Sequence, residues 1–71
     1  MRNSQEVAQE VRQLLKTKKI TAAKMLADCE LGKDTIGHME RGSMPAADKL
    51  AKIALYLGVS TDHLLGIDEQ D

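Results

Sequence analysis

Apolar residues recur at helical spacing along the whole chain, in short runs that glycine and polar residues separate. The first run falls at i, i+4, i+7 and i+8, which is one face of a helix: Val7, Val11, Leu14 and Leu15. Asn3 can cap this helix, and Glu6 three residues later can close a capping box. We therefore expect the first helix over residues 4–17.

Two more helices are expected in the middle of the chain. Thr21 can cap a helix over residues 22–28, with Met25, Leu26 and Cys29 turned inward. Gly32 can cap the next helix, with Asp34 in its first turn. Ile36 and Met39 give that helix a buried edge, and Gly42 ends it.

The last third of the chain also has apolar residues at helical spacing between capping residues. A fourth helix follows Pro45 and stops at Gly58, and four residues form its apolar stripe: Leu50, Ile53, Ala54 and Leu57. Ser60 can cap a fifth helix that Gly66 ends. Five short helices with short turns predict a single all-α domain over residues 1–67, followed by an acidic tail at residues 68–71.

Composition removes several function classes. The chain has 71 residues, and its only aromatic residue, Tyr56, cannot form a base-stacking platform. One cysteine excludes a disulfide framework and fits the reducing cytoplasm. Neither a phosphate-binding glycine loop nor a metal-ligand motif is present, so we expect no cofactor and no metal. The start is too polar for a signal peptide, and no apolar run is long enough to span a membrane.

The net charge of −1 hides an uneven distribution. The tail contributes three acidic residues, so residues 1–67 carry +2, and every charged residue within 12–24 is basic. The lysines at positions 16–19 are either a solvated helix end or an electrostatic footprint for DNA. Catalysis is not expected, because the helical positions turn Cys29 inward and His38 outward, leaving no base beside the thiol.

The second and third helices form the most informative unit. Two short helices joined by a tight turn make a helix-turn-helix, and its second helix can enter the DNA major groove. The apolar spacing leaves the outer face of the third helix to four residues: Lys33, Asp34, Gly37 and His38. Small helical bundles also contain such pairs, so the spacing alone does not decide the function.

From residue 20 to residue 66 the chain resembles the XRE class of helix-turn-helix proteins, the phage-repressor and Cro-like family. The stretches that carry the resemblance are ITAAKMLADCEL, GKDTIGHMERGSMP, ADKLAKIALYLGVS and TDHLLG. The loop and helix start at residues 42–50 are similar to a subgroup of short bacterial and phage regulators.

This resemblance implies a five-helix, lambda-repressor-like domain that acts as a sequence-specific transcriptional regulator, a repressor by operator occupancy. It implies that the third helix reads bases through six residues: Gly32, Lys33, Asp34, Thr35, Gly37 and His38. It assigns phosphate contacts to Thr21, Arg41 and Ser43. The implied partner is double-stranded DNA in the cytoplasm, with no small-molecule effector and no membrane.

The chain departs from the family pattern at five positions: Leu15, Ala22, Glu30, Asp34 and Ala46. Many members have an arginine at the first position, which pairs with the glutamate equivalent to Glu40. Glu30 stands where glycine is usual, and a positive φ there costs about 1–2 kcal/mol. Glu30, Asp34 and the acidic tail weaken attraction to phosphate, which leaves a second reading open: a protein-binding module on the same fold.

For three of these residues, an interpretation without a role in DNA binding also stays open. Lys33 is a DNA contact or a solvated lysine, Asp34 a cytosine reader or a helix-dipole residue, and His38 a DNA contact or plain surface.

One such unit reads few base pairs, so useful affinity requires a homodimer on a palindromic site. Leu55 lies off the core stripe of the fourth helix. The expected dimer face combines it with three apolar residues near the end of the chain: Leu64, Leu65 and Ile67.

Overall fold

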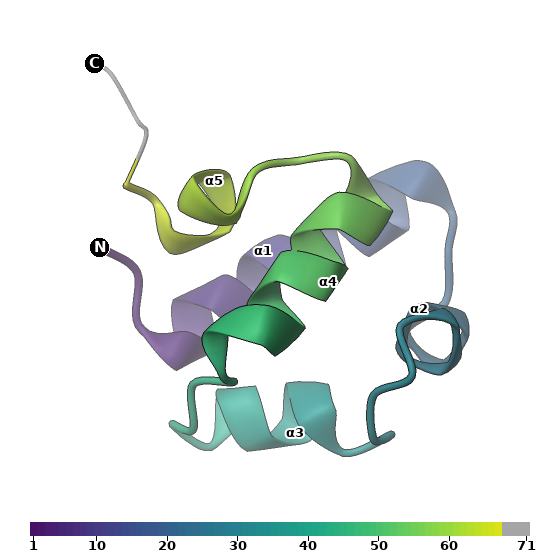
Figure 1. Cartoon of the computed structure of the whole chain (residues 1–71), viewed down its shortest axis with the longest axis horizontal. Coiled ribbons are helices and arrows are strands. Elements are labelled where there is room, and N and C mark those ends of the chain that lie inside the picture. Colours follow the sequence, from purple (N-terminus) through teal and green to yellow (C-terminus); the bar gives the residue numbers. More distant parts are fainter. Residues whose placement is uncertain (68–71) are drawn as a thin grey trace.

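The computed structural model describes residues 1–67 and contains five α-helices in that range, with no strand (Figure 1). They are α1 (Ser4–Lys18), α2 (Ala22–Asp28), α3 (Thr35–Glu40), α4 (Ala47–Leu57) and α5 (Thr61–Leu65). The expected all-α class is confirmed. The acidic tail expected at residues 68–71 lies outside the described residues.

Helix starts follow the expected capping residues, with one exception. Asn3 and Glu6 form the capping box of α1, with the Glu6 amide donating to Asn3 Oδ1 at 2.8 Å. Thr21 caps α2 and Ser60 caps α5 through their side-chain oxygens. Gly32 is not the N-cap of α3, because its carbonyl oxygen closes a separate turn before the helix begins.

All five helices end in the same way. After each one, a residue with positive φ donates its amide to a carbonyl three residues earlier, and the next amide bonds five residues back. Glycine holds this position after α3, α4 and α5, as expected. Lys19 and Glu30 hold it after α1 and α2, each with φ of 60°.

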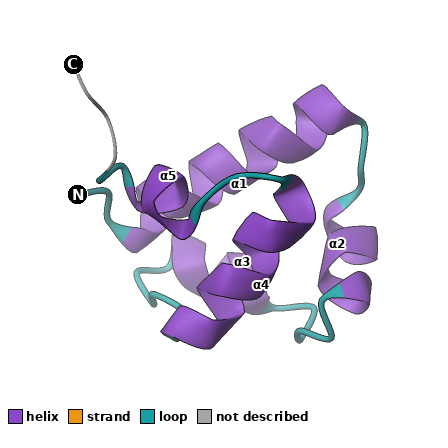
Figure 2. Cartoon of the chain, turned by 45° about the horizontal axis from the view of Figure 1, so that its top comes forward, coloured by secondary structure: helices purple, strands orange, loops and turns teal. Residues whose placement is uncertain are grey.

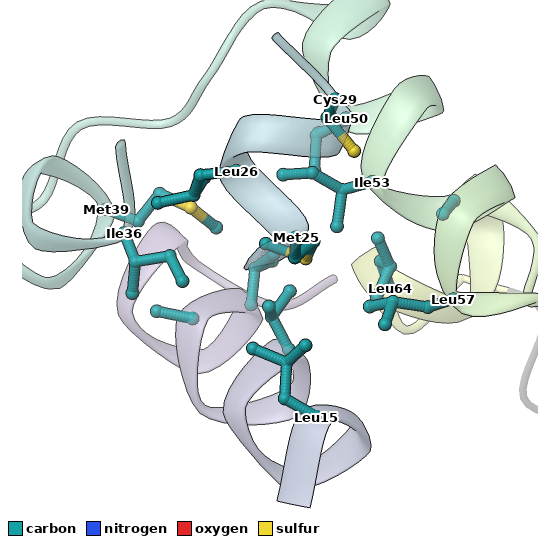
Figure 3. Close-up of a cluster of buried hydrophobic side chains, with 14 residues drawn as sticks. Leu15, Met25, Leu26, Cys29, Ile36, Met39, Leu50, Ile53, Leu57 and Leu64 are labelled. Atoms are coloured by element: carbon teal, nitrogen blue, oxygen red, sulfur yellow. The ribbon is translucent and has the colours of Figure 1, made fainter. Parts of the chain in front are cut away.

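The core draws side chains from every helix, with Met25 near its middle (Figure 3). Fourteen hydrophobic residues are buried: Val7, Ala8, Val11, Leu15, Met25, Leu26, Cys29, Ile36, Met39, Leu50, Ile53, Ala54, Leu57 and Leu64. The apolar stripes expected for the fourth helix and for most of the first are therefore confirmed. Leu14 lies at the edge of the core and is only partly buried.

The expected dimer face is wrong at Leu64, which is fully buried in the core. The reason is that α5 is short and packs on both α1 and α4, so its inward position must fill the space between them. Leu65 is half-buried against the same core. Leu55 and Ile67 are exposed, as expected, with relative exposures of 83% and 52%.

The first residues of the chain are tied to its last helix. The Arg2 amide donates to the Leu65 carbonyl at 2.7 Å, and Arg2 Nη1 donates to the His63 carbonyl at 2.6 Å. The N-terminus and α5 consequently lie on the same side of the molecule (Figures 1 and 2). Within residues 1–67, no helix is long and apolar enough to cross a membrane.

Candidate nucleic-acid interface

The turn between α2 and α3 is built on Glu30. The Glu30 amide donates to the Ala27 carbonyl at 3.1 Å, and the Leu31 amide donates to the Leu26 carbonyl at 2.8 Å. These two bonds require a left-handed backbone at Glu30, which is the strained conformation anticipated if the family turn formed here. They turn the chain sharply after α2, and α3 lies along the lower edge of the molecule in Figure 1.

The residues expected to read bases divide between this turn and α3 itself. Lys33, Asp34 and His38 are exposed, and so is Gly32. Thr35 is half-buried, and its hydroxyl donates to the Gly32 carbonyl at 2.6 Å. Asp34 precedes α3 as its N-cap residue, rather than lying in the first turn, and its side chain makes no capping hydrogen bond. Lys33 and Asp34 therefore present free side chains at the start of α3.

Arg41 folds back over the exposed side of α3. Its Nη2 lies 3.3 Å from His38 Nδ1, and a Cβ added at Gly37 would lie 3.5 Å from its Nη1. Because a guanidinium can only donate, Nδ1 of His38 accepts in this contact, and a neutral ring then carries its proton on Nε2. That leaves an N–H donor on His38 for a group outside the protein.

Thr21 and Ser43, which are expected to contact phosphate like Arg41, lie at two different places. Thr21 is at the start of α2, and Ser43 is beside the exposed edge of α3. The Thr21 hydroxyl oxygen accepts the Lys24 amide at 3.1 Å, so its own hydrogen remains available for donation. Ser43 is exposed in the loop after α3 and lines a shallow hollow with Thr35, His38 and Lys49. Lys49 was not among the expected residues, although a lysine at the start of α4 adds positive charge to the same hollow.

Two side chains of α1 that the sequence analysis missed bond to the last residue of α3. Arg12 Nε lies 2.6 Å from Glu40 Oε2, and Gln5 Nε2 donates to the Glu40 carbonyl at 3.1 Å. The hydrogen bond from Arg12 lowers the pKa of the Glu40 carboxyl. Gln5 and Arg12 are seven residues apart and so share a face of α1, which is the signal that identifies them.

The family pattern placed the arginine partner of Glu40 at the position of Leu15. Here Leu15 is buried in the core, and Arg12 supplies the guanidinium from one turn earlier. The tie between α1 and α3 is thus kept in spite of the departure from the pattern.

The remaining nucleophile and imidazole lie away from this edge. Cys29 is buried, its Sγ donates to the Lys52 carbonyl at 3.7 Å, and burial raises the pKa of its thiol. His63 Nε2 lies 3.0 Å from Glu10 Oε2, where α5 meets α1. Within residues 1–67, no group of three or more potential ligand residues is placed to hold a metal ion.

Comparison with known families gives a match over most of the chain. A family model described as helix-turn-helix matches residues 9–64, from the middle of α1 to α5. The chain belongs to the XRE helix-turn-helix family. No curated protein and no solved structure gives a significant match.

The match confirms the resemblance and the lambda-repressor-like, five-helix fold that it implied. As a member of this family, the chain is a helix-turn-helix DNA-binding regulator, and the family is a regulatory rather than an enzymatic one.

Proposed function

We propose that this XRE-family protein is a sequence-specific transcriptional repressor that binds a palindromic operator as a homodimer and acts by occupying it. The observation that carries the proposal is the exposed edge formed by Lys33, Asp34 and His38 at and just before α3. A helix with a free polar edge of this kind is suited to the major groove.

Each side chain on this edge has a base that suits it. Lys33 can donate to O6 and N7 of guanine, and Asp34 can accept from N4 of cytosine. His38 can donate from Nε2 to N7 of a purine, which fits the tautomer that Arg41 imposes. We therefore propose base reading by the six residues of the turn and α3: Gly32, Lys33, Asp34, Thr35, Gly37 and His38.

Phosphate contacts are proposed for Thr21, Ser43 and Arg41, which position the domain without reading sequence. The lysines between residues 16 and 24 add positive charge near the start of α2. Since a DNA regulator works beside its operator and the lone thiol fits a reducing compartment, we propose that it acts in the cytoplasm of a bacterium.

The test is selection of bound duplexes from a random library, followed by titration of the selected site. We expect a two-fold symmetric consensus and an affinity that falls steeply as salt rises, by about 0.9 log units per log unit of salt for each phosphate contacted. Lys33→Ala should relax the preference at one position in each half-site, at a cost of about 1–3 kcal/mol. Lys18→Ala removes the same charge outside the turn and α3, and should leave the consensus unchanged.

A protein-binding module is the second candidate. It is favoured by the exposed carboxylates of Glu30 and Asp34, which repel phosphate at the approach to α3. Failure of the wild-type chain to retain any duplex at low salt would support this alternative and contradict the repressor proposal.

A further inference from the structure

The side chain of Arg41 lies across the exposed face of α3, although the residue itself is the C-cap that follows the helix. Its Nη1 is the nearest atom to the place where Gly37 would carry a Cβ, at 3.5 Å, and its Nη2 is next, at 4.0 Å. Side chains near a helix end lean toward the N-terminus, so Arg41 covers the turn that precedes it. The guanidinium therefore stands beside the space that a side chain of residue 37 would fill.

Position 37 lies in the middle of the face that we propose to enter the major groove. Gly37 is three residues after Asp34, directly before His38 and four residues before Arg41, and helical residues three or four apart share a face. The middle of such a face meets base edges, whereas the phosphates border the groove on either side. The guanidinium of Arg41 is thus placed toward bases rather than toward the backbone of the duplex.

The guanidinium of Arg41 is also available for a ligand. Arg41 is exposed and forms no ion pair with a carboxylate of residues 1–67, since the adjacent carboxylate of Glu40 pairs with Arg12 at 2.6 Å. The contact of Nη2 with His38 Nδ1, at 3.3 Å, uses one of the five N–H donors of a guanidinium. The planar fork is therefore held by one hydrogen bond and keeps donors for two parallel bonds to another group.

We propose that Arg41 reads a guanine in the major groove, with His38 as the residue that positions its guanidinium. O6 and N7 of guanine are the pair of acceptors that an arginine fork fits. The inference rests on the DNA binding proposed above and refines it: the family position gave Arg41 a phosphate contact, and the place of its guanidinium gives it a base instead. Because the two side chains touch, the bases that they read belong to neighbouring base pairs.

The test compares the sequences that variants select from a random library of duplexes. The wild type should select a two-fold consensus in which each half-site has a guanine that depends on Arg41. Arg41→Ala should reduce the preference for guanine at that position by about tenfold or more. Lys52→Ala removes a positive charge from α4, outside the turn and α3, and should leave every position of the consensus unchanged.

A phosphate contact would give a different result for the same variant. Arg41→Ala would then weaken binding to all duplexes alike, with an unchanged consensus. The slope of log affinity against log salt would become shallower by about 0.9, the amount expected for one lost phosphate contact. That pair of results overturns the proposal.

Two substitutions of His38 test its positioning role. His38→Asn keeps a side-chain acceptor for Arg41 Nη2, so the guanine preference at the position read by Arg41 should be kept. His38→Ala removes the acceptor and should lower this preference by about threefold or more, because residues in contact are coupled. An equal guanine preference in the two variants would overturn the role given to His38.

Failure of this inference differs from failure of the repressor proposal. A wild type that retains no duplex even at low salt overturns both. A wild type that selects a two-fold consensus, which Arg41→Ala leaves unchanged, overturns only the role of Arg41.

Discussion

Glu30 is the residue at which the fold and the side chain conflict. Its φ of 60° serves the bond pattern that ends α2 and starts the turn toward α3. A side chain with a Cβ pays about 1–2 kcal/mol for this conformation, whereas glycine adopts it freely. The helix-turn-helix therefore stores strain at a position where the family commonly has glycine.

Replacing Glu30 by glycine should stabilise the protein. We expect Glu30→Gly to be about 0.5–1 kcal/mol more stable than Glu30→Ala, since both variants lose the carboxylate and only one keeps the Cβ. The melting temperature should rise by about 4–8 °C for each kcal/mol in a domain of this size. Thermal unfolding of the two variants measures the difference, and equal melting temperatures would contradict the strain argument.

At the scale of elements, the helices differ in how their starts are satisfied. Asn3, Thr21 and Ser60 cap α1, α2 and α5 with side-chain oxygens. α4 begins after Ala46, which has an extended backbone and no side-chain cap. The longest helix after α1 thus starts without a side-chain acceptor at its N-cap position.

Adding a hydroxyl at this position should stabilise α4. Ala46→Ser fits the extended backbone and should raise stability by about 0.5–1 kcal/mol, at the low end of measured cap effects because the Lys49 amide already contacts Asp48 Oδ1. Urea denaturation measures the gain. Ala47→Ser places the same hydroxyl one residue into the helix and should give no gain. An equal effect from both changes would be inconsistent with capping.

Thr21 combines a structural contact with a proposed DNA contact, and one substitution separates them. Thr21→Asp keeps an N-cap acceptor and favours the helix dipole, so the melting temperature should change little. The new charge faces phosphate, so duplex affinity should fall by about tenfold or more. Thr21→Ala serves as the comparison, because it should lose about 1 kcal/mol of stability. Unchanged duplex affinity in Thr21→Asp would remove Thr21 from the DNA surface.

At the scale of the whole molecule, a hydrogen bond between two side chains joins α4 to α2. The Tyr56 hydroxyl donates to Asp28 Oδ2 at 2.7 Å. This bond lowers the pKa of Asp28, with help from Lys24, and raises the pKa of Tyr56. It therefore contributes most when the carboxyl is ionised and the phenol is protonated.

The contribution of this bond to stability should depend on pH in both directions. The ionised Asp28 carboxyl stabilises the folded state fully above its unfolded pKa of about 4. This stabilisation is lost as the pH falls through the lowered pKa of the folded state. The protonated Tyr56 phenol stabilises the folded state below about pH 10. This stabilisation is lost as the pH rises through the raised pKa of the folded state. Tyr56→Phe should thus have a lower melting temperature than the wild type at neutral pH. The difference between the two melting temperatures should become smaller in acid and in alkali. A difference that is constant with pH would contradict the assignment.

Short-range patterns in the sequence were sufficient for most of the fold. The capping box at Asn3, the bounds of α2 and the stripe of α4 came from residues within one or two helical turns of each other. Capping and helical periodicity are local, so the order of residues determines them. The set of six base-reading residues followed from the family resemblance and remains a proposal.

Contacts between distant parts of the chain were decided only in the folded structure. Leu64 is a core residue because α5 packs on α1 and α4. Arg12 bonds to Glu40, which lies 28 residues later in the sequence. A shallow hollow beside Leu55 exists because the end of α2 packs near α4. Local order along the chain is enough to set which residues form helices and which face of each helix is apolar. Tertiary packing decided which apolar residues stay uncovered, because burial depends on neighbours that helical periodicity does not specify.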